Sequence, residues 1–289
     1  MKMRYSTMVR CMGQRNHLEN YFAFLDVLKE SHFSDANLSF SEIQGLLNRD
    51  FDMDGFVERF LSYGIPAHYA HAPMYYPFLF NRTDGKAWEE SILCGLELAA
   101  KCGVTDYVIH PGSVVDEELH YLPKASAERN MAYLYPYVKR GAELGVRIAV
   151  ENGVCQPWDE APPVFKDISP GFEELIEITD AFNAAFGKEV CGICFDFGHA
   201  HLQGVSMGDA IRKVGKRLRV THVHDNNGRK DQHLPIGKGT LPWDTVRSAL
   251  RDISYDRELS LELYYDGNED FYADPVAYLN ETYVALKEL

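Results

Sequence analysis

Residues 193–224 read ICFDFGHAHLQGVSMGDAIRKVGKRLRVTHVH, and this stretch shows the pattern on which the whole chain is built. The apolar run Ile193–Phe197 and the β-rich run Arg219–Val223 have the length and composition of buried strands. The longer segment Gly208–Arg217 between them has the spacing of an amphipathic helix. A strand, a helix and a second strand in this order predict one βα unit of a parallel sheet.

The same alternation of short β-rich runs and longer helix-like segments continues from one end of the chain to the other. We predict eight strands, at Met3–Val9, Asn37–Glu42, Ala67–His71, Asp106–His110, Arg147–Glu151, Ile193–Phe197, Arg219–Val223 and Ser260–Leu263. Helices are predicted between them, including Lys86–Lys101, Ala125–Leu144, Phe172–Phe186, Gly208–Arg217, Trp243–Arg251 and Pro275–Leu286. A doubly wound open sheet would give a similar alternation, but eight units without a Pro-, Gly- or Ser-rich linker favour a closed barrel. We therefore expect one α/β domain over residues 1–289, a (β/α)8 TIM barrel.

The composition of the chain is that of an ordinary globular protein, with 46% hydrophobic and 25% charged residues. The formal net charge of −14 would repel the phosphates of nucleic acids and anionic lipids. We therefore expect neither a nucleic acid nor a membrane as a partner. The N-terminal sequence lacks the apolar stretch of a signal peptide, and six cysteines without paired CxxC clusters suit a reducing compartment. Together these features predict a cytoplasmic location.

Polar side chains that can bind metals stand at the carboxyl ends of six consecutive predicted strands, which is the end where a barrel builds its active site. They are His71, His110, Glu151, Asp196 with His199, His222 with His224, and Glu262. Carboxylates that leave hydrophobic strands without a partner would each cost several kcal/mol when buried. A shared cation removes that cost.

Two glutamates, one aspartate and one imidazole form a mostly oxygen-based donor set. Such a set suits Mn²⁺, Mg²⁺ or Co²⁺ and accepts Zn²⁺, so we predict one divalent metal ion. His222 and His224 are two residues apart and face the same side of a strand, so either could be the fourth donor. We favour His222, which lies deeper in the strand, and expect His224 to contact a ligand residue or the substrate.

Several motifs follow one another in order over roughly residues 67–263, namely HAP, HPGS, AVEN, FDFGHAHLQG, HVHDNN, DQHLPIGKGTLPW and LEL. This succession resembles the xylose-isomerase-like barrel superfamily of sugar isomerases and epimerases. The resemblance implies a (β/α)8 barrel, one divalent metal, and isomerisation or epimerisation at a carbon beside a carbonyl. It also implies that Glu151 and Glu262 form the acid/base pair, that His199 contacts a substrate hydroxyl, and that the metal ligands are Glu151, Asp196, His222 and Glu262.

The chemistry of these residue types agrees with the resemblance. Removing a proton from a carbon beside a carbonyl needs a positioned base, and a metal bridging two substrate oxygens would stabilise the resulting enediolate. Two carboxylates could deliver the proton from either side. A dehydratase or lyase working through the same enediolate is a close alternative. A non-catalytic sugar-binding barrel is a further one, although a purely structural barrel has no reason to bury four metal-binding side chains.

Endonuclease IV, a DNA-repair enzyme of the same superfamily, gives a second interpretation. The nine ligands of its three-metal cluster all have counterparts here, at His71, His110, Glu151, Asp196, His199, His222, Asp231, His233 and Glu262. Clustered metals of this kind cleave phosphodiesters. DNA binding, however, needs lysines and arginines around the site, and the stretches after His71 and Glu151 carry almost none. A multi-metal phosphodiesterase therefore ranks second.

Further substrate contacts are expected from the histidines and from two of the loops. The sugar-binding residues that we predict are His71, His110, His199, His224, Lys238 and Trp158, with Gly153–Gly171 as a candidate lid. Four aromatic residues after the third predicted strand could wall the sugar or close a subunit interface in a homo-oligomer, and core packing explains them equally well. They are Tyr75, Tyr76, Phe78 and Phe80.

Overall fold

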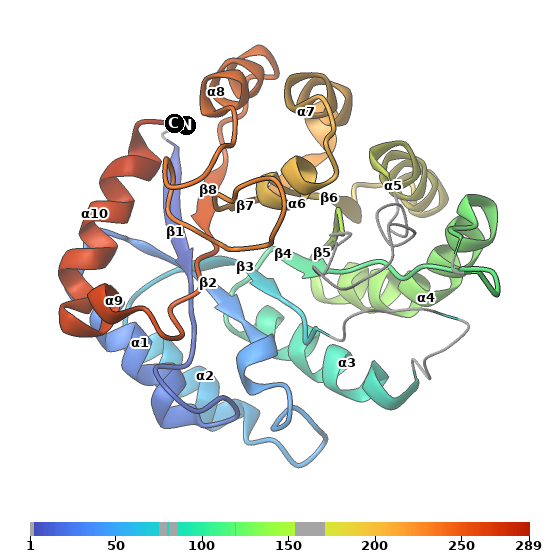
Figure 1. Ribbon diagram of the computed structural model, residues 1–289. Coiled ribbons are helices and arrows are strands. Elements are labelled where there is room, and N and C mark those ends of the chain that lie inside the picture. Colours follow the sequence, from blue (N-terminus) through green and yellow to red (C-terminus); the bar gives the residue numbers. More distant parts are fainter. Residues whose placement is uncertain (1–2, 75–79, 81–85, 119, 154–170) are drawn as a thin grey trace.

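The computed structural model describes residues 3–74, 80, 86–118, 120–153 and 171–289. Eight parallel strands pair in chain order, and the eighth also pairs with the first, which closes the sheet into a barrel (Figure 1). The strands are β1 (Arg4–Met8), β2 (Asp35–Ser39), β3 (Ala67–His71), β4 (Asp106–Ile109), β5 (Arg147–Glu151), β6 (Cys191–Asp196), β7 (Leu218–Val223) and β8 (Glu258–Leu261). The predicted (β/α)8 barrel is confirmed, and the open doubly wound sheet is excluded.

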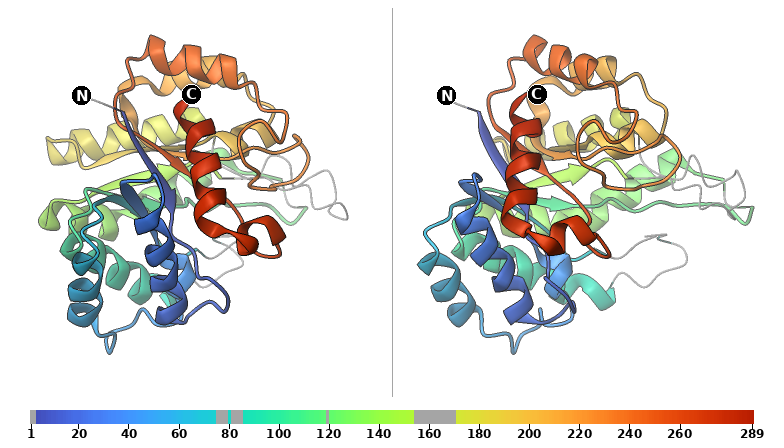
Figure 2. Two further views of the ribbon diagram at one scale, coloured as in Figure 1. Left: turned by 90° about the vertical axis from the view of Figure 1, so that its left-hand side faces the viewer. Right: turned by 60° about the vertical axis from the view of Figure 1, so that its left-hand side comes forward.

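Helices run between the strands and form an outer ring around the barrel (Figure 1). The last helix packs beside the first and completes this ring, as the side views show (Figure 2). The helices are α1 (Leu18–Glu30), α2 (Met53–Ser62), α3 (Lys86–Lys101), α4 (Pro123–Leu144), α5 (Phe172–Phe186), α6 (Phe197–Leu202), α7 (Met207–Val214), α8 (Trp243–Asp252), α9 (Glu269–Ala273) and α10 (Pro275–Lys287), with 3-10 turns η1 (Phe40–Ile43) and η3 (Gly215–Arg217). No helix in the described ranges combines the length and the apolar character needed to cross a bilayer.

Most predicted strand boundaries lie within two residues of those observed, and the second strand differs most. It was expected at Asn37–Glu42, whereas β2 ends at Ser39 because the chain coils into η1 directly afterwards. This turn keeps Glu42 buried but takes it out of the sheet. Glu42 is therefore free to bond with side chains from neighbouring strand ends.

Two other predicted ends also need correction. The helix expected at Gly208–Arg217 ends as α7 at Val214, because Gly215 adopts a φ of 55° and the chain tightens into η3. The eighth strand ends two residues earlier than predicted. As a result, Glu262 lies just past β8, in the first position after the strand.

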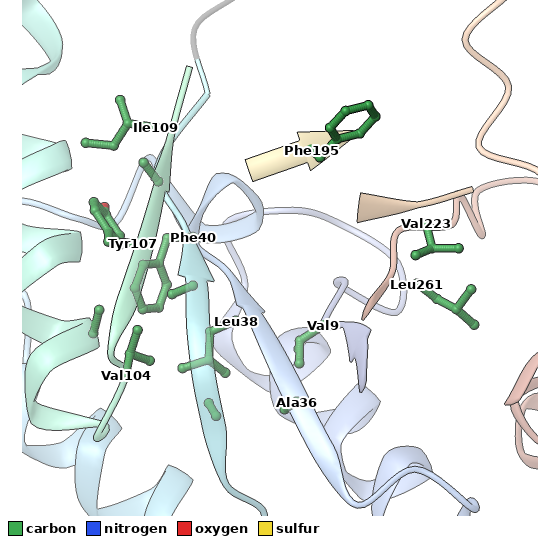
Figure 3. Packing of buried hydrophobic residues seen from close by; sticks show 14 of the residues in the cluster. Val9, Ala36, Leu38, Phe40, Val104, Tyr107, Ile109, Phe195, Val223 and Leu261 are labelled. Atoms are coloured by element: carbon green, nitrogen blue, oxygen red, sulfur yellow. The ribbon is translucent and has the colours of Figure 1, made fainter. Parts of the chain in front are cut away.

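Two hydrophobic layers hold the barrel together. The larger lies between strands and helices, where side chains such as Leu38, Phe40 and Tyr107 pack near one another (Figure 3). The smaller lies inside the barrel and consists of Tyr69, Val108, Ala149, Cys194 and Val220. Because side chains alternate along a strand, one set faces the helices and the other the barrel axis. The interior layer is short, so both ends of the barrel are left to polar side chains.

The amino-terminal end of the barrel, where the strands begin, is closed by what we call the basal ion pairs. Asp106 of β4 accepts hydrogen bonds from Arg147 at 2.7 and 2.9 Å and from Arg219 at 3.2 Å. Gly192 of β6 leaves room for Arg219, because a Cβ there would collide with the arginine side chain. The other basal pairs are His68–Asp35 at 3.1 Å and Arg4–Glu258 at 3.4 Å.

Several predicted loop residues lie outside the described residues. They are Trp158, Tyr75, Tyr76, Phe78 and the candidate lid Gly153–Gly171 except for its first and last residues. Phe80 is described, and its ring lies 5.6 Å from that of Tyr133 in α4. The guanidinium of Arg129 lies 5.5 Å from the centre of the same ring, so Phe80 packs against α4.

Candidate functional site

The carboxyl ends of the strands bring the nine predicted metal-binding residues together. Six stand at or near the ends of β3 to β8, one lies in α6, and two lie in the segment between β7 and α8. Together with His224, these residues form three groups, in each of which all potential ligand atoms lie within 4.8 Å of one another. The central group is Glu151, Asp196, His222 and Glu262; the second is His71, His110 and Glu151; the third is His199, His224, Asp231 and His233.

The central group contains the four residues expected to hold one divalent ion. Nδ1 of His222 lies 2.9 Å from Oε2 of Glu262, 3.1 Å from Oε1 of Glu151 and 3.8 Å from Oδ2 of Asp196. Both ring nitrogens of His222 and Oε2 of Glu262 are buried, and despite these short distances none of the three has a partner in hydrogen-bonding geometry. Buried polar atoms without partners are costly, and a cation among them would satisfy them. The residues of the central group therefore fit a divalent metal ion.

The second group shares Glu151 with the central group but contacts its other carboxylate oxygen. Oε2 of Glu151 lies 3.2 Å from Nε2 of His71 and 3.3 Å from Nε2 of His110. The two ring nitrogens are themselves 3.2 Å apart. Glu151 thus presents one oxygen to the central group and the other to a pair of imidazoles.

The third group lies beside the first two, nearer the segment before α8. Oδ2 of Asp231 lies 3.1 Å from Nε2 of His233 and 3.6 Å from Nε2 of His199. Oδ1 of Asp231 and Nδ1 of His224 are buried without hydrogen-bond partners. Three imidazoles and one carboxylate form a more nitrogen-rich set than the central group, which suits a borderline ion such as Zn²⁺.

Three histidines are oriented in the manner typical of metal ligands. Nδ1 of His71 lies 2.7 Å from the carbonyl oxygen of Ala72. Nδ1 of His199 lies 2.9 Å from the carbonyl oxygen of Asn152, and Nδ1 of His233 lies 2.7 Å from that of Glu262. A carbonyl oxygen only accepts, so each Nδ1 carries a hydrogen, and in the neutral imidazole each Nε2 would offer its lone pair to an ion in the site. This arrangement of a backbone carbonyl behind an imidazole fixes the tautomer that a metal needs.

The electrostatics of the site favour positive charge at its centre. Burial would raise the pKa of Glu151, but the neighbouring His110 and His222 hold that pKa well below its ordinary value. Burial would lower the pKa of His222, yet Cys194, Glu151 and Glu262 raise it well above the ordinary value. The carboxylates therefore stabilise a positive charge between them, carried either by protonated His222 or by a divalent cation. Burial lowers the pKa of His110 to about 4, so this imidazole is neutral at neutral pH and available as a ligand.

His224 lies inside the site and contacts a predicted metal ligand. Its Nε2 is 3.0 Å from both carboxylate oxygens of Asp196, and its ring stacks on that of His233 at 3.8 Å. Gly198 at the start of α6 makes this possible, because a Cβ there would collide with the imidazole. Contact between His224 and a substrate stays a prediction. Lys238 is exposed in the segment before α8, so its role toward a sugar also stays a prediction.

Sequence reasoning missed residues that hold the site in place. Asn152 ties β5 to β6, since its side chain accepts from the backbone N–H of Asp196 at 2.8 Å and donates to the Asp196 carbonyl at 3.0 Å. Asp225 accepts from the indole N–H of Trp243 at 2.9 Å. Both stand next to predicted site residues in the motifs AVEN and HVHDNN, which was the available signal. Arg10, which donates to Glu262 at 3.4 Å, had no such signal.

Comparison with known proteins places the chain in a family. The sequence model of the family described as "Xylose isomerase-like TIM barrel" matches residues 28–282. The chain belongs to this family. An uncharacterized protein of Methanocaldococcus jannaschii is 28% identical over 200 residues, and the match spans 66% of this chain and 62% of that protein. The chain therefore covers somewhat less than two thirds of that relative's length.

Two further relatives differ from each other in the class of reaction that their names describe. A D-psicose 3-epimerase of Enterocloster bolteae is 37% identical over 90 residues, which span 31% of this chain and 27% of the epimerase. A probable endonuclease 4 of Staphylococcus saprophyticus is 25% identical over 225 residues, which span 72% of this chain and 70% of the endonuclease.

Solved structures of other proteins share the whole fold. A D-tagatose 3-epimerase-like protein has a TM-score of 0.71 at 21% identity, covering 99% of both chains. The IolI protein with a bound zinc atom also has a TM-score of 0.71, at 19% identity, covering 99% of this chain and 96% of IolI. At sequence identities this low, the structural similarity establishes the barrel fold alone.

Proposed function

We propose that the protein is a divalent-metal-dependent isomerase or epimerase of a sugar or a sugar-like polyol. The observation that carries this proposal is the placement of two buried glutamates in one donor group, Glu151 at the end of β5 and Glu262 just past β8. These positions are three strands apart around the ring, so the two carboxylates approach a central substrate from different sides. The D-psicose 3-epimerase relative supports the reaction class.

The metal of this proposal is Mn²⁺, Mg²⁺, Co²⁺ or Zn²⁺, held by the central group. The buried oxygen and nitrogen atoms without hydrogen-bond partners support such an ion, as does the zinc in IolI. When bound, the ion would supply positive charge to the oxygens of a substrate from which a proton is removed.

The protein's own residues would bind the sugar and move the proton. Burial would raise the pKa of Glu262, but the neighbouring His222 and His233 hold it well below its ordinary value, and Glu151 is likewise held as a carboxylate. One glutamate would take the proton from the carbon beside the carbonyl, and the other would return a proton from the opposite side. His199, fixed through its Nδ1, would offer its other ring nitrogen to a substrate hydroxyl.

Hydrogen exchange in D₂O tests this proposal. The Mn²⁺-loaded protein would be incubated with a panel of keto- and aldo-sugars and followed by NMR. We expect deuterium at a carbon beside the carbonyl together with conversion to an isomer or epimer, and loss of both after chelation. Exchange followed by loss of water would instead identify a dehydratase. Metal-loaded protein that binds sugars but exchanges no proton would reject catalysis and leave a sugar-binding barrel.

One observation favours a second candidate function, a multi-metal phosphodiesterase. All nine residues predicted as ligands of a three-metal cluster converge in the three groups, and Glu151 is shared between two of them. Adjacent metal ions that share a carboxylate are a device for cleaving phosphodiesters. The endonuclease 4 relative supports this candidate.

Metal content and DNA binding separate the two candidates. An isomerase is expected to keep full activity with one tightly bound ion per chain, whereas the phosphodiesterase would need close to three. The net charge of −14 predicts negligible affinity for duplexes with abasic sites, even at low salt where such binding is strongest. Salt-sensitive binding together with strand cleavage would reverse the ranking.

A further inference from the structure

Arg10, the second residue after β1, lies among acidic groups at the carboxyl end of the barrel. Its side chain is only 8% exposed. Nη1 donates to Oε1 of Glu42 at 3.3 Å, and Nη2 donates to Oε1 of Glu262 at 3.4 Å. The guanidinium also lies over the ring of Tyr264, 5.3 Å from its centre. Arg10 thus connects the chain after β1 with the segments that follow β2 and β8.

Glu42 holds Arg10 in this position. Its carboxylate is buried in η1, where Oε2 accepts the backbone N–H of Cys11 at 3.0 Å and Oε1 accepts from Arg10. Because both oxygens are engaged, the carboxylate cannot turn freely, and the planar guanidinium bonded to it is fixed as well. Arg15 also approaches Oε1 of Glu42, at 3.6 Å, but its side chain is 53% exposed.

The contact with Arg10 gives the two oxygens of Glu262 different surroundings. Oε1 is bonded to the guanidinium, while Oε2 has no hydrogen-bond partner and lies 2.9 Å from Nδ1 of His222 in the central group. Glu151 differs, since both of its oxygens lie close to imidazoles, Oε1 at 3.1 Å from His222 and Oε2 at 3.2 Å from His71. Arg10 therefore sets which oxygen of Glu262 is left for an ion.

We propose that Arg10, anchored by Glu42, is a positioning residue that orients Glu262 toward the metal. Groups that bond to the far side of a metal ligand typically account for about 10–100-fold in metal affinity or activity. The expected effect on turnover rests on the proposed function, whereas the expected effect on metal binding does not, because metal binding is measured without a substrate. The positive charge of Arg10 by itself would repel a metal ion, so a purely electrostatic role predicts tighter metal binding when the charge is removed. A positioning role predicts weaker binding.

Competition with a chelator, using Mn²⁺ and Zn²⁺ as probes, tests this inference. Arg10→Met is expected to weaken metal binding by about 10–100-fold. Arg10→Lys, which keeps the charge but loses the planar fork, should fall between Arg10→Met and the unchanged protein. Arg15→Met is the matched control, because it removes an arginine beside the same Glu42 without removing a contact to Glu262, and it should leave metal binding unchanged. Arg10→Met that binds metal as tightly as Arg15→Met, or more tightly, overturns the inference.

A second variant keeps the test decisive if Arg10→Met does not fold. Glu42→Gln retains an acceptor for Arg10 but loses the ionic anchor, and it should weaken metal binding relative to Arg15→Met. Equal affinity in Glu42→Gln, Arg10→Lys and Arg15→Met would overturn the positioning role. Where a sugar is turned over, Arg10→Lys should lower kcat more than it raises KM. If no sugar is turned over while the order of metal affinities holds, the proposed function fails and the positioning role stands.

Discussion

The two ends of the barrel bury carboxylates in different ways. At the amino-terminal end, Asp106 is bonded by Arg147 and Arg219, so its charge is matched by guanidinium groups. At the carboxyl end, the carboxylates of the central group contact mainly imidazoles. Among the described residues, the arginine that contacts them is Arg10, which bonds to Glu262. A guanidinium stays charged and cannot bind a metal, whereas a neutral imidazole can. The same fold therefore uses buried carboxylates for cohesion at one end and keeps them open to a cation at the other.

The largest effect is expected from the two glutamates of the carboxyl end. Glu151→Gln and Glu262→Gln should each lower turnover by about 10²–10⁴-fold, because a general acid or base is removed. For an epimerase that uses two bases, one of the variants should still exchange the substrate proton in D₂O without forming product. Steady-state kinetics and NMR measure both effects, and Glu143→Gln on the exposed side of α4 serves as control. Near-normal turnover in both variants, with metal still bound, would refute the acid/base assignment.

The basal ion pairs should respond in stability rather than in chemistry. Asp106→Asn leaves two arginines without their carboxylate, and loss of one partner of a buried ion pair typically costs about 3–5 kcal/mol in the free energy of unfolding. Turnover per folded molecule should stay unchanged. Asp180→Asn, which breaks a largely exposed pair with Arg217, should cost about 1 kcal/mol or less. Urea denaturation measures both, and equal losses would contradict the distinction between the two kinds of pair.

Metal removal should lower the stability contributed by the carboxyl end and leave that of the basal ion pairs unchanged. A ligand that binds only the folded state at about 1,000 times its Kd stabilises that state by about 4 kcal/mol, so chelation should lower Tm. The difference in Tm with and without metal should persist in Asp106→Asn and disappear in a Glu151→Gln/Asp196→Asn double variant. Differential scanning calorimetry measures this difference. A metal-dependent Tm in the double variant would show that the ion binds elsewhere.

The smallest expected effect is the pH dependence contributed by Glu258 at the amino-terminal end. Burial raises the pKa of Glu258 to about 7, above the ordinary value near 4.3 that holds in the unfolded chain. The folded state therefore binds this proton more tightly, and the associated stability is complete below about pH 4 and lost as the pH rises to about 7. The loss amounts to about 3 kcal/mol. Glu258→Gln should flatten this part of the stability curve in urea titrations at pH 5 and pH 7.5, and an unchanged slope would exclude Glu258 as its source.

Local patterns identified the candidate metal-binding residues because these stand directly after apolar strands. Glu151 follows Ile-Ala-Val and Asp196 follows Ile-Cys-Phe, so burial of a carboxylate is visible in the sequence itself. Arg10 gave no such signal, since its contact with Glu262 joins residues 252 positions apart and exists only because the barrel closes. Nothing near Arg10 in the sequence distinguishes it from a surface arginine.

Other features depend on how neighbouring strands meet. Asp106 begins β4 and Arg147 begins the neighbouring β5, whereas Arg219 is the second residue of β7, three strands away, so the three meet only because the sheet closes into a barrel. The position of His224 beside Asp196 depends on the missing side chain of Gly198, which a sequence shows only as one glycine among 22. Residue types and spacing reveal which groups reach the site, whereas contacts across strands decide what each group does there.

The segment between β7 and α8 is attached at both ends to a single carboxylate. Asp225 accepts hydrogen bonds from the backbone N–H groups of Gly237 and Leu241, at 2.9 and 3.1 Å, and from the Trp243 indole. Residues 226–240 therefore form a self-contained cassette whose start and finish meet at one point. This cassette carries Asp231 and His233, two residues of the third group, whereas the central group belongs to strand ends and lies outside it. Replacing this one loop would thus remove two of the four residues of the third group while leaving the barrel and the central group unchanged.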